Sequence, residues 1–133
     1  MRLKISRALL ARLLKESAAS ANEVCGLLFG AGEEITHALK CANVAADPAT
    51  MFEIEPTALI AAHKAARSGG PMLLGHYHSH PNGSIEPSSR DAAAAPADGA
   101  IWLILAAGEA RVWRAVAQGA VVGRFDPVAL DLI

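Results

Sequence analysis

The sequence has no excess of charge of either sign. Its 12 lysine and arginine residues are balanced by 13 aspartate and glutamate residues, which leaves a formal net charge of −1 at pH 7. Proteins that bind DNA or RNA need a basic surface that neutralises phosphates, and this composition does not provide one. We therefore expect no nucleic-acid partner.

The sequence also has few cysteines and no long apolar run. Cys25 and Cys41 are its only cysteines, and the basic N-terminal residues are not followed by an apolar run long enough for a signal peptide. The longest apolar run, residues 100–107, is far shorter than the roughly 20 residues of a membrane-spanning helix. We expect a cytoplasmic protein with no membrane partner, in which both thiols stay reduced.

The apolar patterns predict one mixed α/β domain over residues 1–133. Leucines at helical spacing after Ser6 predict a first helix, and Pro56 suits the start of a second that ends near Arg67. The strands between these helices favour a curved, mostly antiparallel sheet with flanking helices. The expected strands are 3–5, 23–29, 35–39, 51–54, one beginning at 71–75, 100–106, 110–116 and a last one over 121–125 that ends before Asp126 and Pro127.

Residue types that bind metals are concentrated between His76 and Asp91, a segment that contains three of the five histidines. Alternation along the strand that begins at 71–75 places positions 76, 78 and 80 on one face. Two imidazoles that are two residues apart on a strand can both bind one zinc ion, with zinc–nitrogen distances of roughly 2.0–2.1 Å. Periodicity alone does not choose between His76 with His78 and His78 with His80.

Ser88 begins a short helix after Pro87, and Asp91 lies on the first turn of that helix, on the same face as Ser88. Taken alone, this pair is typical of a capping box, in which the serine side chain caps the helix and the acidic side chain bonds back to the serine backbone. Taken with the histidines, the Asp91 carboxylate can instead be a metal ligand. Both interpretations remain open at this point.

The order of these residues resembles the signature of the JAMM (MPN-plus) metalloproteases. That signature combines His-x-His-Pro, here at 78–81, with Ser-x-x-Asp, here at 88–91. The family also has a glutamate far upstream, and the segment 23–30, which begins with Glu23, fits it. The resemblance covers nearly the whole chain and implies the MPN fold, a cytidine-deaminase-like fold.

The resemblance also implies a zinc site. It assigns one zinc ion per chain to His78, His80 and Asp91, and it leaves His76 as a core residue or a neighbour of the ligands. Three protein ligands leave the fourth tetrahedral position to water, which is typical of catalytic zinc. Cys25 is expected to face the same side as Glu23 and to pack there as a small buried side chain.

The implied catalytic residues are Glu23 and Ser88. Zinc brings the pKa of a bound water towards about 7, and the family assigns proton transfer to the residue that matches Glu23. The Ser88 hydroxyl can donate to the oxyanion that develops during attack on an amide. Base deamination is disfavoured, because the His-x-Glu and Pro-Cys-x-x-Cys signature of the deaminases is absent.

The implied function is that of a zinc-dependent isopeptidase or peptidase, a hydrolase. Family members cleave the amide bond after the Gly-Gly tail of a ubiquitin-like protein, and the short connections at 44–50 and 92–99 resemble the minimal prokaryotic form, which points to a sulfur-carrier protein as substrate. The rivals are a non-catalytic MPN-type scaffold, a DNA-repair-associated relative with the same metal motif, and a structural or storage metal site. The sequence leaves the oligomeric state open.

Overall fold

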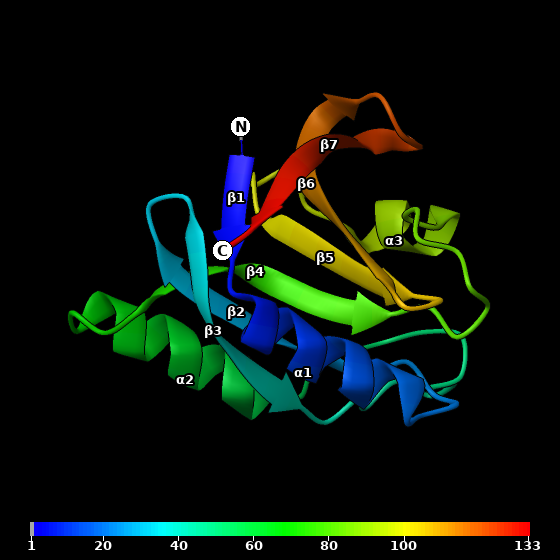
Figure 1. Ribbon diagram of the computed structural model, residues 1–133, viewed down its shortest axis with the longest axis horizontal. Coiled ribbons are helices and arrows are strands. Elements are labelled where there is room, and N and C mark those ends of the chain that lie inside the picture. Colours follow the sequence, from blue (N-terminus) through cyan, green and yellow to red (C-terminus); the bar gives the residue numbers. More distant parts are fainter. Residues whose placement is uncertain (1) are drawn as a thin grey trace.

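The computed structural model describes residues 2–133, in which strands and helices are arranged as Figure 1 shows. The strands are β1 (Arg2–Ile5), β2 (Cys25–Ala31), β3 (Glu34–Cys41), β4 (Met72–Ser79), β5 (Ile101–Ala106), β6 (Glu109–Gly119) and β7 (Gly123–Leu132). The helices are α1 (Arg7–Ala18), α2 (Pro56–Arg67) and α3 (Ser89–Ala94). None of the described helices is long and apolar enough to span a membrane.

The strands form one closed sheet in the order β1-β3-β2-β4-β5-β6-β7. β2 pairs antiparallel with β3 and β4, and β6 pairs antiparallel with β5 and β7. The remaining pairs are parallel: β1 with β3, β1 with β7, and β4 with β5. The predicted class, a mixed α/β fold with a mostly antiparallel sheet, is confirmed. The closed form of the sheet was not predicted, because it depends on the pairing of β1 with β3 and with β7, which are distant from β1 in the sequence.

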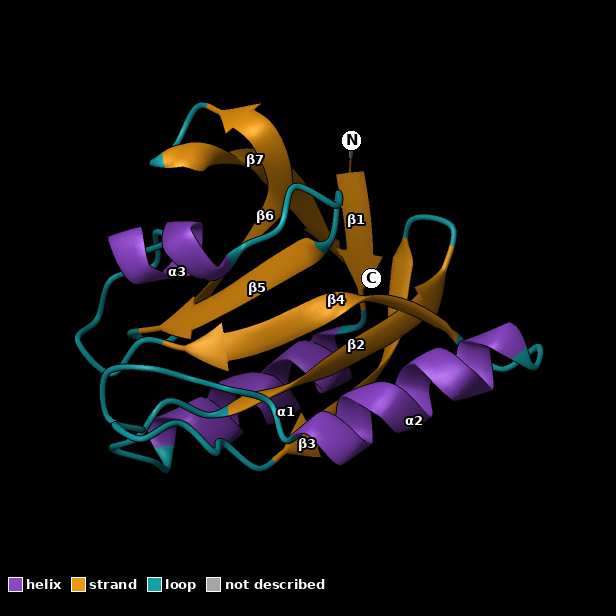
Figure 2. Cartoon of the chain, turned by 180° about the vertical axis from the view of Figure 1, so that it is seen from behind, coloured by secondary structure: helices purple, strands orange, loops and turns teal. Residues whose placement is uncertain are grey.

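The sheet is apolar on both faces. One face packs against the leucines of α1 and includes Tyr77 of β4 and Leu103 of β5. The other face carries Trp102 and Ile104 of β5; α3 lies beside β7 and away from α1 and α2 (Figure 2). Strand residues alternate between faces, and His78 is paired with Ile104 in the register of β4 and β5. His78 therefore faces away from α1.

Glycines allow the strands near the site to approach closely. A Cβ at Gly75 of β4 would overlap the backbone carbonyl of Ile101, and one at Gly26 of β2 would overlap the carbonyl of Leu39 and the Tyr77 ring. A larger residue at either position would push neighbouring strands apart. The strands that lead into the candidate site thus owe their spacing to these two glycines.

The bounds of most expected strands differ from the observed ones, and three of these differences affect the sheet or the candidate site. Residues 51–54 form a loop outside the sheet, in which Ile54 makes an isolated bridge with Asn43. β2 begins at Cys25, so Glu23 precedes it instead of lying within it. The prediction that the last strand ends before Pro127 was wrong, since β7 continues to Leu132. β7 pairs with β1 only from Ala129 onward, so the missing N–H of Pro127 faces no second strand there.

Candidate active site

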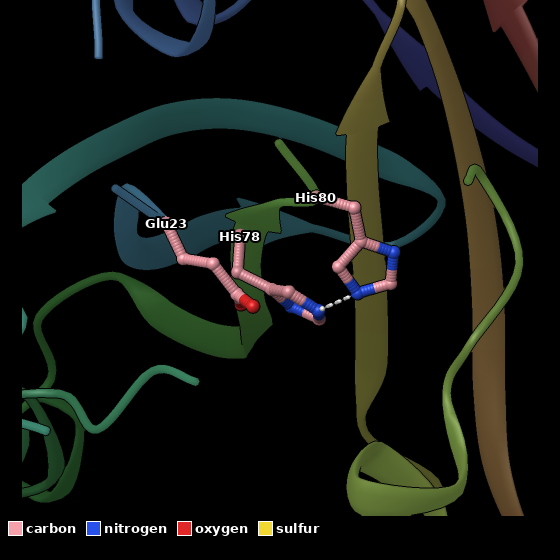
Figure 3. A group of neighbouring side chains, drawn as sticks. All are labelled: Glu23, His78 and His80. Atoms are coloured by element: carbon pink, nitrogen blue, oxygen red, sulfur yellow. Dashed lines mark hydrogen bonds between the residues drawn. The ribbon is translucent and has the colours of Figure 1, made fainter. Parts of the chain in front are cut away.

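Three buried side chains from two strand ends point toward one another (Figure 3). Glu23 lies just before β2, His78 is near the end of β4, and His80 follows β4. The antiparallel register, which pairs Cys25 with His78, places the start of β2 beside the end of β4. Potential ligand atoms of Glu23, His78 and His80 all lie within 4.8 Å of one another.

Asp91 completes a tighter group with the two histidines. The Nε2 atoms of His78 and His80 are 3.0 Å apart. One Asp91 oxygen lies 3.1 Å from His80 Nε2, and the other lies 3.4 Å from His78 Nε2. Bonds of 2.0–2.2 Å in a tetrahedral arrangement separate ligand atoms by roughly 3.3 Å. The spacing and the donor set, two imidazole nitrogens and a carboxylate, therefore fit a zinc ion.

The orientation of the two rings also fits a cation. His80 Nδ1 lies 2.8 Å from the carbonyl oxygen of Ser84. Because a carbonyl only accepts, this hydrogen bond needs the proton on Nδ1, and a neutral His80 then turns the lone pair of Nε2 toward His78. His78 Nε2 lies 3.0 Å from this lone pair, so the contact is satisfied either by a proton on His78 Nε2 or by a metal ion bound to both nitrogens. The lone pair of His80 is therefore directed to the place where such an ion would bind.

The lowered pKa of Asp91 agrees with that arrangement. Burial alone favours the protonated carboxyl, but hydrogen bonds with His78, His80 and the backbone N–H of Ser88 hold the pKa of Asp91 well below its usual range. Burial lowers the pKa of His78. Burial also opposes the charged form of His80, but Asp91, the Ser84 carbonyl and Glu23 together raise the pKa of His80. A proton on His80 competes with a metal ion for the same nitrogen.

His76 lies behind His78 and outside the inward-facing group. Its Nε2 is 3.3 Å from His78 Nδ1, and its ring meets Trp102 edge-on at 4.3 Å between centroids. Phe52 stacks on the His78 ring at 4.2 Å. These contacts fix the His78 ring from two sides, as the neighbours of metal-binding histidines commonly do.

The backbone of Glu23 is fixed by two hydrogen bonds with other segments, and that of its neighbour Val24 by a third. Its N–H donates to the carbonyl of Pro48 at 2.7 Å, and its carbonyl accepts from the Asn43 amide at 2.9 Å. The N–H of the following residue, Val24, donates to the Ser79 hydroxyl at 2.9 Å. Burial raises the pKa of Glu23 to about 7, with His80 and Arg90 opposing and Asp91 adding to the effect.

The predicted capping box is present at the start of α3. Asp91 N–H donates to Ser88 Oγ at 3.0 Å, and Ser88 N–H donates to an Asp91 carboxylate oxygen at 2.9 Å. In this bond Ser88 Oγ acts as an acceptor, so its own hydroxyl proton is free to be donated elsewhere. The two interpretations of the pair are therefore compatible.

Two residues of the site had no signal in the sequence: Phe52 and Asn43. Phe52 lies in the loop that replaces the expected strand 51–54, whereas Asn43 lies just after β3 and is hydrogen-bonded to that loop. The Asn43 side chain also donates to the carbonyl of Met51 and accepts from the N–H of Glu53. Cys25, by contrast, behaves as expected: it is buried opposite His78, and burial raises the pKa of its thiol to about 12, so it packs as a neutral side chain.

Two clefts open onto the group. One, of about 440 Å³, lies between the 50–54 loop, His76, Trp102 and α3. The other, of about 360 Å³, follows residues 80–90 and includes Ser88. Glu23, Thr50 and Arg90 line both clefts, so a polypeptide chain that passes from one to the other crosses the site.

Known proteins resemble this chain in sequence over part of its length. A desampylase from Haloferax volcanii is 37% identical over 84 residues, which are 62% of this chain and 60% of that protein. A probable TtuB-protein conjugate cleaving protease from Thermus thermophilus is 40% identical over 81 residues, 61% of this chain and 52% of that protein. The matches thus span little more than half of each relative.

Solved structures resemble the whole fold. A protein from Desulfitobacterium hafniense superposes with a TM-score of 0.81 at 23% identity, covering 98% of this chain and 92% of that one. A JAB1/MPN domain protein from Archaeoglobus fulgidus superposes with a TM-score of 0.61 at 20% identity, covering 99% and 98%. The MPN-type architecture implied by the sequence motifs agrees with these folds.

The family itself is shown by a match that covers most of the chain. Residues 6–116 fit the model of Prok-JAB, the prokaryotic homologs of the JAB domain. This range includes Glu23, His78, His80 and Asp91, and it agrees with the resemblance to the JAMM motif. The chain therefore belongs to the prokaryotic homologs of the JAB domain.

Proposed function

We propose that the protein is a zinc-dependent isopeptidase or peptidase that hydrolyses the amide bond after the Gly-Gly tail of a ubiquitin-like or sulfur-carrier protein. The observation that carries the proposal is the buried, inward-facing group of His78, His80 and Asp91, with Glu23 beside it. The desampylase and the probable conjugate-cleaving protease, which are 37% and 40% identical to parts of this chain, support the substrate class.

His78, His80 and Asp91 are the proposed zinc ligands. A zinc ion held by them would supply Lewis acidity, lowering the pKa of a water to about 7 and polarising the scissile carbonyl. Glu23 is an alternative third ligand, because it also lies near both histidines. The separations within the Asp91 group are 3.0–3.4 Å, against up to 4.8 Å in the group with Glu23. The closer set favours Asp91.

Glu23 then remains available for proton transfer. Its carboxylate accepts a proton from the attacking water as the water oxygen bonds to the carbonyl carbon, and it delivers that proton to the amine as the carbon–nitrogen bond breaks. The Ser88 hydroxyl, whose proton the helix cap does not use, donates to the carbonyl oxygen as negative charge develops there. Each residue of the group thus has a distinct role.

Zinc content tests the ligand set. We expect one zinc ion per chain, lost when His78, His80 or Asp91 is replaced with alanine. His76→Ala should keep the metal with an affinity lower by about 10–100-fold, because only the support of His78 Nδ1 is removed. His63→Ala, on the exposed side of α2, is the matched control. Elemental analysis and chelator competition measure both quantities, and zinc loss in His76→Ala with full retention in His80→Ala would show that the ligand pair is wrong.

Glu23→Gln separates catalysis from metal binding. The amide keeps the size of the side chain but cannot take a proton, so zinc should stay while kcat falls by about 10²–10⁴-fold. The substrate is a ubiquitin-like protein with a residue added after its Gly-Gly tail, and the release of that residue is followed by mass spectrometry.

Glu53→Gln is the control for Glu23→Gln, since Glu53 is an exposed acid that lines only the larger cleft. It should turn over like the wild type. Near-wild-type hydrolysis by Glu23→Gln would contradict the mechanism, whereas zinc loss in that variant would make Glu23 a ligand.

Ser88→Ala tests the second catalytic role. Loss of the cap should lower the free energy of unfolding by about 0.5–2 kcal/mol, and loss of the oxyanion donor should lower kcat by about 10²–10³-fold. Ser89→Ala, one residue along, is the control for both measurements. A Ser88→Ala protein that melts earlier but turns over at the normal rate would leave capping as the only role of Ser88.

A further inference from the structure

Arg90 is an unexplained positive charge in the candidate site. Among the described residues that line the two clefts, it is the only lysine or arginine, and it lines both of them together with Glu23. The other charged residues there are acids, apart from the histidines. Neither the proposed metal ligands nor the proposed proton transfer uses the guanidinium.

The guanidinium is held in place without being neutralised. Its Nη1 donates to Thr50 Oγ1 at 3.1 Å, and the Thr50 hydroxyl donates in turn to an Asp47 carboxylate oxygen at 2.7 Å. Arg90 forms no ion pair with any carboxylate of residues 2–133. An arginine has five N–H donors in a fixed fork that matches a carboxylate. One donor is used by Thr50, and the others remain for a ligand.

The position of Arg90 defines which part of a substrate it meets. Glu23 must lie beside the scissile nitrogen to return a proton to it, and Arg90 shares both clefts with Glu23. When the leaving residue is joined through its α-amino group, its own carboxyl group lies directly beside that nitrogen. When the leaving group is a lysine side chain, a flexible four-carbon stem separates the nitrogen from the backbone, and the backbone carboxyl is a neutral amide of the conjugated protein.

We propose that Arg90 binds the free α-carboxylate of the residue that is released, so that the enzyme favours tails that end one amino acid after Gly-Gly over lysine-linked conjugates. This inference rests on the proposed function and specifies its leaving group. Bidentate hydrogen bonds between guanidinium and carboxylate supply the selectivity. Arg90 is exposed, so solvent screening limits the expected effect to about tenfold.

The test compares two substrates that differ only at the carboxylate. A bacterial sulfur-carrier protein is prepared with its tail extended to Gly-Gly-Ala, ending either in a free carboxylate or in a carboxamide. The zinc-loaded wild type should show a kcat/KM about tenfold higher for the acid than for the amide. In R90Q that ratio should fall to about 1, because a neutral side chain cannot distinguish the two ends.

R67Q, which removes an arginine at the end of α2 outside both clefts, is the control and should keep the wild-type ratio. A general loss of activity or stability in R90Q would lower both rates but leave their ratio unchanged. A wild-type ratio near 1, or a ratio in R90Q equal to that of the wild type, would overturn the role of Arg90. Failure of the wild type to cleave either substrate, or a lysine-linked conjugate, would overturn the proposed function and this inference with it.

Discussion

The candidate site depends on three side chains that meet in a buried place. The Nε2 atoms of His78 and His80 and the carboxylate of Asp91 lie within 3.0–3.4 Å of one another, and all three residues are buried. Two imidazole nitrogens and one carboxylate at this spacing form a donor set that fits a zinc ion. The fold around these residues is therefore best understood as a support for a metal ion.

Several parts of the fold hold this arrangement. The β2–β4 ladder brings Glu23 to the end of β4, and the Ser79 hydroxyl extends that contact by accepting from Val24 N–H. The capping box orients Asp91, while His76 and Phe52 fix the His78 ring. Most of these contacts join segments distant in sequence. The site therefore forms only when the sheet does.

Local patterns in the sequence were sufficient to predict the residues that lie close together along the chain. Strand alternation placed His76 and His78 on one face, and the Ser88–Asp91 spacing predicted the helix cap that the structure contains. Alternation could not choose between the histidine pairs, because that choice depends on where Asp91 arrives in space. The family resemblance supplied the pair His78 and His80, whose Nε2 atoms lie 3.0 Å apart with Asp91 within 3.4 Å of both.

The features that depend on contacts between segments distant in sequence were not predicted. Phe52 and Asn43 act from a loop whose path is fixed by contacts with the start of β2, and no periodicity in that loop reveals them. The continuation of β7 past Pro127 was missed for the same reason: it is tolerated because β1 does not pair with that part of β7. A single sequence shows a proline but not which side of the strand lacks a neighbour.

The ligand set of His78, His80 and Asp91 is tested most directly by a crystal structure of the zinc-loaded protein with anomalous data collected on both sides of the zinc absorption edge. We expect one peak, at roughly 2.0–2.1 Å from Nε2 of His78 and of His80 and at roughly 2.0–2.2 Å from an Asp91 oxygen, with Glu23 unbound to it. A peak coordinated by Glu23 in place of Asp91, a peak on the far side of His78 at His76, or no peak at all would contradict it.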